Sequence, residues 1–131
     1  SVFVIGIGNS GNVGEYGARY FTNLGKFTLF VSDPFYPINL MESVSTAAVL
    51  LSVSGETEQI LNIANELKQR KCSVISITSS DRCTLAQLSD INMSYYITIR
   101  HEEGKIDWTS QIPAIYFLES LAKRVHNRLA E

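Results

Sequence analysis

The stretch Ser52-Val53-Ser54-Gly55-Glu56-Thr57 lies between two segments with different apolar patterns. The run before it, Val49-Leu50-Leu51, is short and apolar, which is typical of a buried β-strand. In the segment after it, apolar residues recur at helical spacing, at Ile60, Leu61, Ala64 and Leu67. The sequence therefore predicts that a cluster of hydroxyl side chains lies where a strand ends and a helix begins.

This cluster has the chemistry of an anion-binding site. The first amides of a helix have no partner within the helix, and the helix dipole adds positive charge there, so such a terminus binds anions, phosphate in particular. Gly55 lets the backbone approach a ligand closely, and Ser52, Ser54 and Thr57 can each donate a hydroxyl proton. The alternative is an ordinary helix with Ser54 as its N-cap and Thr57 or Glu58 in the first turn. One hydroxyl is enough for a cap, so three around a glycine favour the anion site.

Strands and helices alternate along the whole chain. Strands are predicted at residues 2–7, 27–31, 49–51, 74–78 and 93–99, and a glycine-rich turn at residues 8–14. Helices are predicted after the first and third strands, at residues 39–44 and 84–88 as short segments, and at residues 112–129. This alternation implies parallel strands with right-handed crossovers, and the continuous apolar strands imply burial on both faces. The expected fold class is α/β, a three-layer α/β/α sandwich with a five-stranded parallel sheet.

Two loops are predicted to meet at one edge of this sheet. Ligands bind beyond the carboxyl ends of parallel strands, and residues 8–10 and 52–57 both follow strands at that edge. Residues 6–11 also spell the dinucleotide fingerprint Gly-x-Gly-x-x-Gly, with Asp33 about where an acidic ribose ligand belongs. However, Asp33 precedes a proline, where acidic turn residues are common, and the fingerprint gives no role to the hydroxyl cluster. NAD binding is therefore the weaker alternative, and we expect Asp33 to be a turn residue.

These motifs resemble those of sugar isomerase (SIS) domains. Ser-x-Ser-Gly-Glu-Thr at residues 52–57 is similar to the phosphate loop of that family, which includes domains of glucosamine-6-phosphate synthase. Gly-Ile-Gly-Asn-Ser at residues 6–10 resembles its first ligand loop. The resemblance runs through Asp90 and, more loosely, to the C-terminal helix, and the spacing looks most like the effector domain of RpiR-type transcription regulators. It implies the SIS, flavodoxin-like version of the fold.

The resemblance also implies roles for particular residues. The phosphate would be bound by Ser52, Ser54, Gly55 and Thr57, and the sugar by Asn9 and Ser10. The family's enzymes take their acid–base residues from segments that find no match in this chain, and the resemblance gives no metal ligand or cofactor, so we expect the domain to sense a sugar phosphate without converting it. Because the chain opens without methionine inside a predicted strand, we expect a fragment. The resemblance implies a helix-turn-helix domain before Ser1, through which alone DNA would be contacted.

The main alternative function is a small aldose–ketose sugar phosphate isomerase. Arg100-His101-Glu102-Glu103 follows the last predicted strand at the same edge, and a histidine beside carboxylates is suited to moving protons. A solvated, hairpin-like loop that ends at Gly104 explains these residues without catalysis. Glu56 is a second candidate base, although beside the expected phosphate it can simply favour the helix N-terminus. Turnover distinguishes the sensor from the isomerase.

Composition and charge exclude several other classes of protein. The chain has 131 residues, 45% of them hydrophobic, and a net charge of −2, which is typical of one globular domain that does not bind nucleic acid by itself. Neither a membrane-spanning stretch nor a secretory signal is present in the sequence, so we expect a cytoplasmic protein without membrane contacts.

Two further expectations concern thiols and assembly. Cys72 and Cys83 lack the spacing of a zinc or redox site and are expected to be free thiols. Tyr116, Phe117 and Leu121 widen the apolar face of the last helix beyond what one sheet needs. Because a large exposed apolar patch usually marks an interface, the sequence predicts a homodimer or higher oligomer.

Overall fold

Five parallel strands form the central sheet of the structure, a computed structural model that describes residues 1–38, 46–99, 101–102 and 106–130. The strands are β1 (Val2–Gly6), β2 (Thr28–Val31), β3 (Ala47–Leu51), β4 (Ser73–Thr78) and β5 (Ile91–Ser94). Their order in the sheet is β2-β1-β3-β4-β5. The chain therefore runs from β1 to one neighbour, β2, and then returns to the other side of β1 to form β3.

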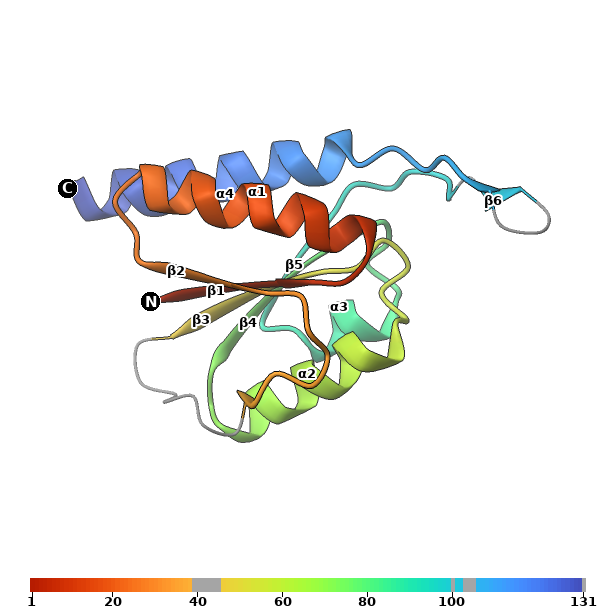
Figure 1. Cartoon of the computed structure of the whole chain (residues 1–131), viewed down its shortest axis with the longest axis horizontal. Coiled ribbons are helices and arrows are strands. Elements are labelled where there is room, and N and C mark those ends of the chain that lie inside the picture. Colours follow the sequence, from red (N-terminus) through yellow and green to blue (C-terminus); the bar gives the residue numbers. More distant parts are fainter. Residues whose placement is uncertain (39–45, 100, 103–105, 131) are drawn as a thin grey trace.

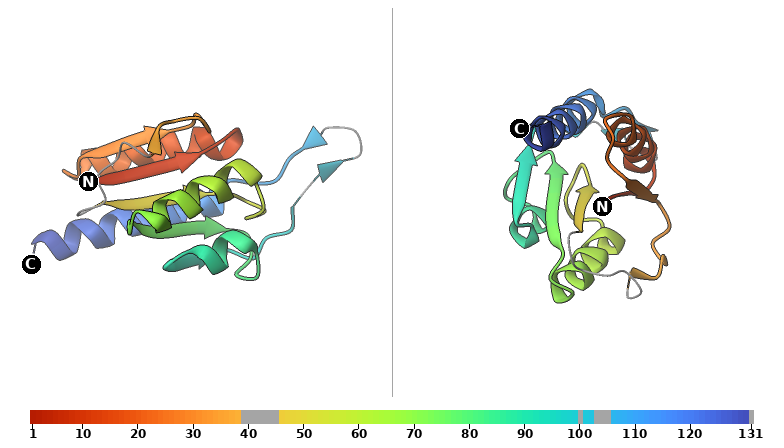
Figure 2. Two further views of the ribbon diagram at one scale, coloured as in Figure 1. Left: turned by 90° about the horizontal axis from the view of Figure 1, so that it is seen from below. Right: turned by 90° about the vertical axis from the view of Figure 1, so that its left-hand side faces the viewer.

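Helices cover both faces of the sheet. α1 (Asn9–Asn23) and α4 (Ile112–Ala130) lie side by side on one face, and α2 (Glu58–Gln69) and α3 (Thr84–Leu88) lie on the other (Figures 1 and 2). Between β5 and α4, β6 (His101–Glu102) and β7 (Ile106–Asp107) pair antiparallel and project beyond the carboxyl edge of the sheet (Figure 1). The predicted three-layer α/β/α sandwich with a five-stranded parallel sheet is thus confirmed.

Alternating side chains of the strands build two apolar cores. Along β3, Val49 and Leu51 pack toward α1 and α4, whereas Ala48 and Leu50 pack toward α2 and α3. Such alternation follows from the two-residue period of a strand. The sheet is consequently buried on both faces, as its continuous apolar strands predict. Among the described helices, none is long and apolar enough to cross a membrane.

The predicted glycine-rich turn at residues 8–14 is wrong, because α1 begins at Asn9. The glycines of this segment allow close packing rather than a long turn. A Cβ atom on Gly11 would lie 2.9 Å from the carbonyl oxygen of Gly6, and one on Gly17 would lie 2.8 Å from Cδ1 of Leu118 in α4. The helix can therefore start directly after β1 and lie closely against the sheet and α4.

Two other predicted segments have a different outcome. The last strand of the sheet spans residues 91–94 instead of 93–99. β4 ends at Thr78, which pairs with Ser94, so β5 has no strand to pair with after Ser94. Tyr96 then turns the chain, with a φ of 52°. The predicted short helix at residues 39–44 lies outside the described residues.

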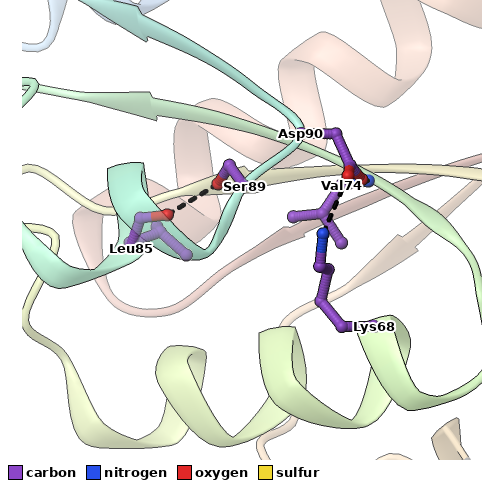
Figure 3. Close-up of polar contacts among 5 residues, drawn as sticks. All are labelled: Lys68, Val74, Leu85, Ser89 and Asp90. Atoms are coloured by element: carbon purple, nitrogen blue, oxygen red, sulfur yellow. Dashed lines mark hydrogen bonds and ion pairs between the residues drawn. The ribbon is translucent and has the colours of Figure 1, made fainter.

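Asp90 joins three elements at the amino edge of the sheet, opposite the hydroxyl cluster. Its carboxylate accepts a hydrogen bond from Nζ of Lys68 in α2 at 2.7 Å and from the backbone amide of Val74 in β4 at 2.8 Å (Figure 3). These two interactions hold the pKa of Asp90 below its usual value. Beside it, the Ser89 hydroxyl donates to the carbonyl of Leu85 and closes α3. The contacts of Asp90 join α2, β4 and the segment before β5 at the amino edge.

Candidate functional site

A cavity of about 220 Å³ lies at the carboxyl edge of the sheet, beyond the neighbouring strands β1 and β3. The chain leaves these two strands toward opposite sides of the sheet, so their loops diverge. In open α/β sheets this switch point is where ligands bind. Most of the polar lining residues come from three segments. These are the start of α1, residues 52–57, which we call the hydroxyl loop, and residues 107–111 from the end of β7 to the start of α4, which we call the strap.

The hydroxyl loop is held in shape by its own hydrogen bonds. Ser52 is buried, and its Oγ accepts the backbone amide of Gly55 at 3.0 Å and lies 3.2 Å from Oγ1 of Thr57. Ser54 is exposed, and its Oγ accepts the amide of Glu56 at 3.1 Å. Ser52, Ser54 and Thr57 all line the cavity. The three predicted hydroxyl residues therefore converge on one space.

Gly55 does not line the cavity but determines how the loop turns. Its φ is +70°, in the region that side-chain-bearing residues rarely adopt. A Cβ atom there would lie 2.1 Å from Sγ of Cys83, so the loop backbone packs directly against that buried thiol. A glycine is required at position 55 by this φ and by the contact with Cys83, which lies on the side of the loop away from the cavity.

Two helices begin at the cavity, and no side chain of the described residues caps either of them. The N-cap of α2 is Thr57 and that of α1 is Gly8. The alternative with Ser54 as an N-cap is therefore wrong, since α2 starts three residues later than that hypothesis requires. Asn9 and Ser10, in the first turn of α1, line the same cavity as the hydroxyl loop. Two sets of helix amides with partial positive charge thus border one small space.

Glu56 is not among the lining residues of the cavity, because its carboxylate points to α3. It accepts the amide of Thr84 at 2.8 Å and the hydroxyl of Thr84 at 3.1 Å. The hydrogen bond from the Thr84 hydroxyl, followed by that from the amide, lowers the pKa of Glu56. The amide of Leu85 also donates to the carbonyl of Gly55 at 3.0 Å. Glu56 therefore favours the N-terminus of α3, not that of α2, and fastens the hydroxyl loop to it.

Asp33 forms a local turn, as expected. Its Oδ1 accepts the backbone amide of Phe35 at 2.9 Å. In addition, β1 lies between β2 and β3, whereas the usual dinucleotide-binding order, 3-2-1-4-5-6, places β1 between the second and fourth strands. The strand order and the turn both disfavour the NAD alternative.

The strap supplies lining residues that the sequence analysis missed. Asp107, Thr109 and Gln111 line the cavity, together with the apolar side chain of Ile99 after β5. Asp107 Oδ1 accepts the amide of Thr109 at 3.0 Å, which is the turn that an Asp-x-Thr sequence favours. The Asp-x-Thr pattern allows a turn to be predicted from the sequence, but it does not indicate that this turn lies beside the cavity.

The charged segment at residues 100–103 is only partly described. His101 and Glu102 form β6, consistent with a hairpin, but their side chains and residues 100 and 103–105 lie outside what the structure describes. Across the described part of the chain, no group of three or more His, Cys, Asp or Glu side chains is placed to hold a metal ion. Both cysteines are free and buried.

Comparison with protein families and sequences identifies relatives of two kinds. A family model described as the SIS domain matches residues 1–122. An HTH-type transcriptional regulator of Thermotoga maritima is 32% identical over 125 residues, which is 92% of this chain and 43% of that protein. A 3-hexulose-6-phosphate isomerase of Methanocaldococcus jannaschii is 30% identical over 129 residues, which is 98% of this chain and 68% of that protein. The chain thus spans less than half of the regulator.

Solved structures share the fold. The E. coli CFT073 protein c3406 in complex with arabinose 5-phosphate superposes with a TM-score of 0.85 at 23% identity, covering 99% of this chain and 71% of that one. The Vibrio vulnificus NanR protein complexed with ManNAc-6P gives 0.80 at 22% identity, with 97% and 48% covered. The sugar isomerase domain of an RpiR transcription factor from Sphaerobacter thermophilus gives 0.79 at 16% identity, with 97% and 70% covered.

Proposed function

Since the chain belongs to the SIS domain family, we propose that it binds a sugar phosphate and serves as the effector-sensing domain of a transcription regulator. One observation carries the binding part of this proposal. Two helices whose N-termini lack a side-chain cap among the described residues begin at the same small cavity, beside three hydroxyls. Unpaired helix amides and hydroxyl donors together are suited to phosphate oxygens. Similar folds that were solved with arabinose 5-phosphate and ManNAc-6P support this assignment.

Within this proposal, the two ends of the ligand bind to different helices. Ser52, Ser54 and Thr57 donate hydrogen bonds to the phosphate, and Gly55 keeps the loop backbone in the shape that permits this. Asn9 and Ser10, at the start of α1, contact hydroxyls of the sugar. The cavity of about 220 Å³ is smaller than the roughly 300–1,000 Å³ of drug-sized ligand sites, so it suits a single phosphorylated monosaccharide.

The regulator part of the proposal rests on the Thermotoga relative. The chain matches 43% of that regulator's length, so we propose that residues 1–131 are the SIS domain of a longer protein and that a helix-turn-helix domain contacts DNA. The net charge of −2 gives this domain little attraction for DNA phosphates. A salt-sensitive gel shift of operator DNA by residues 1–131 alone would contradict this division of roles.

The proposed assembly is a homodimer or higher oligomer through α4. Ile112 and Tyr116 on this helix are 74% and 67% exposed, whereas Phe117 and Leu121 are half-buried and pack against the core. The exposed apolar patch is therefore narrower than the sequence predicts but is still present. Sedimentation equilibrium at micromolar concentration is the test, and a monomer there contradicts the proposal.

Single hydroxyl deletions test the proposed phosphate site. Thr57→Val and Ser54→Ala each remove one donor, and a hydrogen bond to a charged group contributes roughly 1.5–3 kcal/mol. We therefore expect each change to weaken sugar phosphate binding by about 10-fold to 100-fold, at ~1.4 kcal/mol per decade. Titration calorimetry with glucosamine 6-phosphate, glucose 6-phosphate and NADH measures the effect.

Two control variants make this test specific. Thr22→Val removes a hydroxyl that donates to the carbonyl of Ala18 within α1, away from the cavity, and should leave affinity unchanged. Asp33→Ala should also leave it unchanged. If Asp33→Ala weakens binding, Thr57→Val does not, and NADH binds in preference to sugar phosphates, the sugar phosphate assignment is wrong.

The isomerase relative supports a second candidate function, aldose–ketose isomerisation. We expect no turnover, because general acid–base catalysis needs a group within hydrogen-bond reach of the substrate proton. Glu56 is engaged by Thr84 outside the cavity, and Asp107, the carboxylate that does line the cavity, accepts the amide of Thr109 in a local turn. Incubation with hexose and pentose phosphates in deuterated water measures proton exchange at carbons 1 and 2. Exchange that is abolished by His101→Ala, Glu102→Ala or Asp107→Ala would establish the isomerase and overturn the sensor.

A further inference from the structure

Two consecutive residues of the hydroxyl loop, Gly55 and Glu56, hold the serines that line the cavity. The backbone amide of Gly55 donates to Oγ of Ser52 at 3.0 Å, and the amide of Glu56 donates to Oγ of Ser54 at 3.1 Å. A serine Oγ that accepts an amide still has its own proton to donate. The two amides therefore fix the position of each serine Oγ and leave both hydroxyls able to donate to a ligand in the cavity.

The start of α3 holds the same two residues from the other side. The carbonyl of Gly55 accepts the amide of Leu85 at 3.0 Å. The carboxylate of Glu56 accepts the amide of Thr84 at 2.8 Å and the hydroxyl of Thr84 at 3.1 Å. The side chain of Leu85 is fully buried in the core on the face of the sheet that α2 and α3 cover (Figure 1). Each cavity serine is thus connected, through one loop residue, to a helix that packs into the core.

The charge of Glu56 is unfavourable for its place in the loop. In the sequence it lies between Ser54 and Thr57, to which the proposed function assigns phosphate binding, and a carboxylate close to a phosphate dianion repels it. If charge alone mattered, removal of the carboxylate would strengthen binding. The hydrogen bonds to Thr84 give the opposite expectation, because without them the Glu56 amide is no longer held against Ser54 Oγ. The two effects differ in sign, so an experiment can separate them.

We propose that Glu56 and Thr84 are positioning residues for phosphate binding, which act through the backbone amide of Glu56 on the hydroxyl of Ser54. Neither of their side chains lines the cavity, so neither contacts the ligand. The carboxylate acts as a hydrogen-bond acceptor and not as a charge or a base. This inference rests on the proposed sugar phosphate function and adds to it that affinity depends on a contact outside the cavity, between residues 28 positions apart.

Four variants separate the hydrogen bonds from the charge. Glu56→Ala removes both. Glu56→Gln removes the charge, but it keeps an oxygen for the Thr84 amide, and its NH₂ group can donate to the Thr84 hydroxyl, which also accepts. Thr84→Val removes the hydroxyl donor and keeps the amide. Glu58→Ala is the matched control, because Glu58 is also exposed, does not line the cavity, and is joined to α3 by no hydrogen bond of the described residues.

Titration calorimetry with glucosamine 6-phosphate, and competition with inorganic phosphate, measure the effect. One hydrogen bond to a charged group corresponds to about 10-fold to 100-fold in affinity, and a misplaced Ser54 loses part of one, so we expect Glu56→Ala to weaken binding about tenfold. Thr84→Val, which removes one exposed contact, should weaken it about threefold. Glu56→Gln and Glu58→Ala should stay within about twofold of wild type.

Two further results distinguish positioning from a general loss of structure. Inorganic phosphate should weaken by the same factor as the sugar phosphate, because the hydroxyl loop binds only the phosphate end of the ligand. In the double variant Glu56→Ala, Thr84→Val, the second change should add no further loss, since the contact that it removes is already absent. Urea unfolding shows whether each variant is folded. If Glu56→Ala does not fold, an unchanged affinity of Thr84→Val is enough to overturn the inference.

The outcomes distinguish this inference from the proposed function. If Glu56→Ala binds as tightly as wild type, or more tightly, the positioning role is wrong and the sugar phosphate function stands. The same holds if Glu56→Gln is as weak as Glu56→Ala, if the losses of Glu56→Ala and Thr84→Val add in the double variant, or if Glu58→Ala weakens binding as much as Glu56→Ala. If the wild-type chain binds neither glucosamine 6-phosphate nor inorganic phosphate, both proposals are wrong.

Discussion

Replacing Gly55 with alanine is expected to lower the free energy of unfolding by about 2–5 kcal/mol and to abolish measurable sugar phosphate binding. Two costs add at this position. The backbone φ of +70° is unfavourable by roughly 1–2 kcal/mol for a residue with a Cβ atom. The new Cβ would also lie 2.1 Å from Sγ and 2.6 Å from Cβ of Cys83, and overpacking of this kind costs typically about 1–3 kcal/mol.

Binding should be lost because the loop cannot move without losing its shape. The amide of Gly55 donates to Ser52 Oγ, its carbonyl accepts from Leu85, and Glu56 beside it is held by Thr84. A shift that relieves the clash with Cys83 must break some of these contacts and move the hydroxyls away from the cavity. Urea unfolding and calorimetry with glucosamine 6-phosphate measure the two effects separately.

Gly25→Ala is the matched control for this prediction. Gly25 has a φ of +89°, and a Cβ atom there would lie more than 4 Å from every described residue other than its two chain neighbours. This variant therefore isolates the backbone cost, about 1–2 kcal/mol, from the clash, and it should bind the ligand normally. If Gly55→Ala costs no more stability than Gly25→Ala and binds with unchanged affinity, the contact with Cys83 does not shape the loop.

Most of the fold and the position of the hydroxyl loop could be predicted from local pattern. The apolar run before Ser52 and the helical spacing after Thr57 place the loop at the end of a buried strand, and parallel strands bring the start of α1 to the same edge. These features depend on residues close in sequence and on general rules of parallel sheets. For this reason the sequence alone is enough to place Asn9 beside the loop.

The residue at which α2 begins and the hydrogen-bond partner of Glu56 could not be predicted from local pattern. Ser54 and Glu56 are typical of a helix start, but Glu56 bonds Thr84, a residue 28 positions later in the chain. Once the carboxylate is fixed on α3, the helix begins after it, at Glu58. The partner of a capping residue across the fold is a tertiary contact, and local spacing contains no information about it.

The roles of the α1 glycines and of the strap could not be predicted for a related reason. Gly17 is tolerated inside a helix because Leu118 of α4 occupies the space of its side chain, and this contact joins residues about 100 positions apart. Asp107 belongs to β7, which pairs antiparallel with β6 far along the chain from the hydroxyl loop, and yet it lines the same cavity. Neither of these long-range contacts is marked by a repeating pattern in the sequence. Sequence reasoning therefore places the part of the site that lies at the strand ends, but not the part that the irregular segment supplies.

The phosphate group itself should contribute most of the binding free energy, so we expect glucosamine to bind at least about 1,000-fold more weakly than glucosamine 6-phosphate. The dianion meets three hydroxyls and the amides at the start of α2, to which no described side chain makes a capping hydrogen bond. Three charge-assisted hydrogen bonds at roughly 1.5–3 kcal/mol each sum to about 4.5–9 kcal/mol. Part of this free energy is offset, because Ser52 and Thr57 can hydrogen-bond to each other when the site is empty. A net contribution of ~4 kcal/mol corresponds to about 1,000-fold in affinity.

Competition calorimetry measures the affinity of both ligands, and inorganic phosphate should compete with the sugar phosphate. In the double variant Ser54→Ala, Thr57→Val the difference between the two ligands should shrink. A free sugar that binds within about tenfold of its phosphate would mean that the hydroxyl loop does not hold the phosphate.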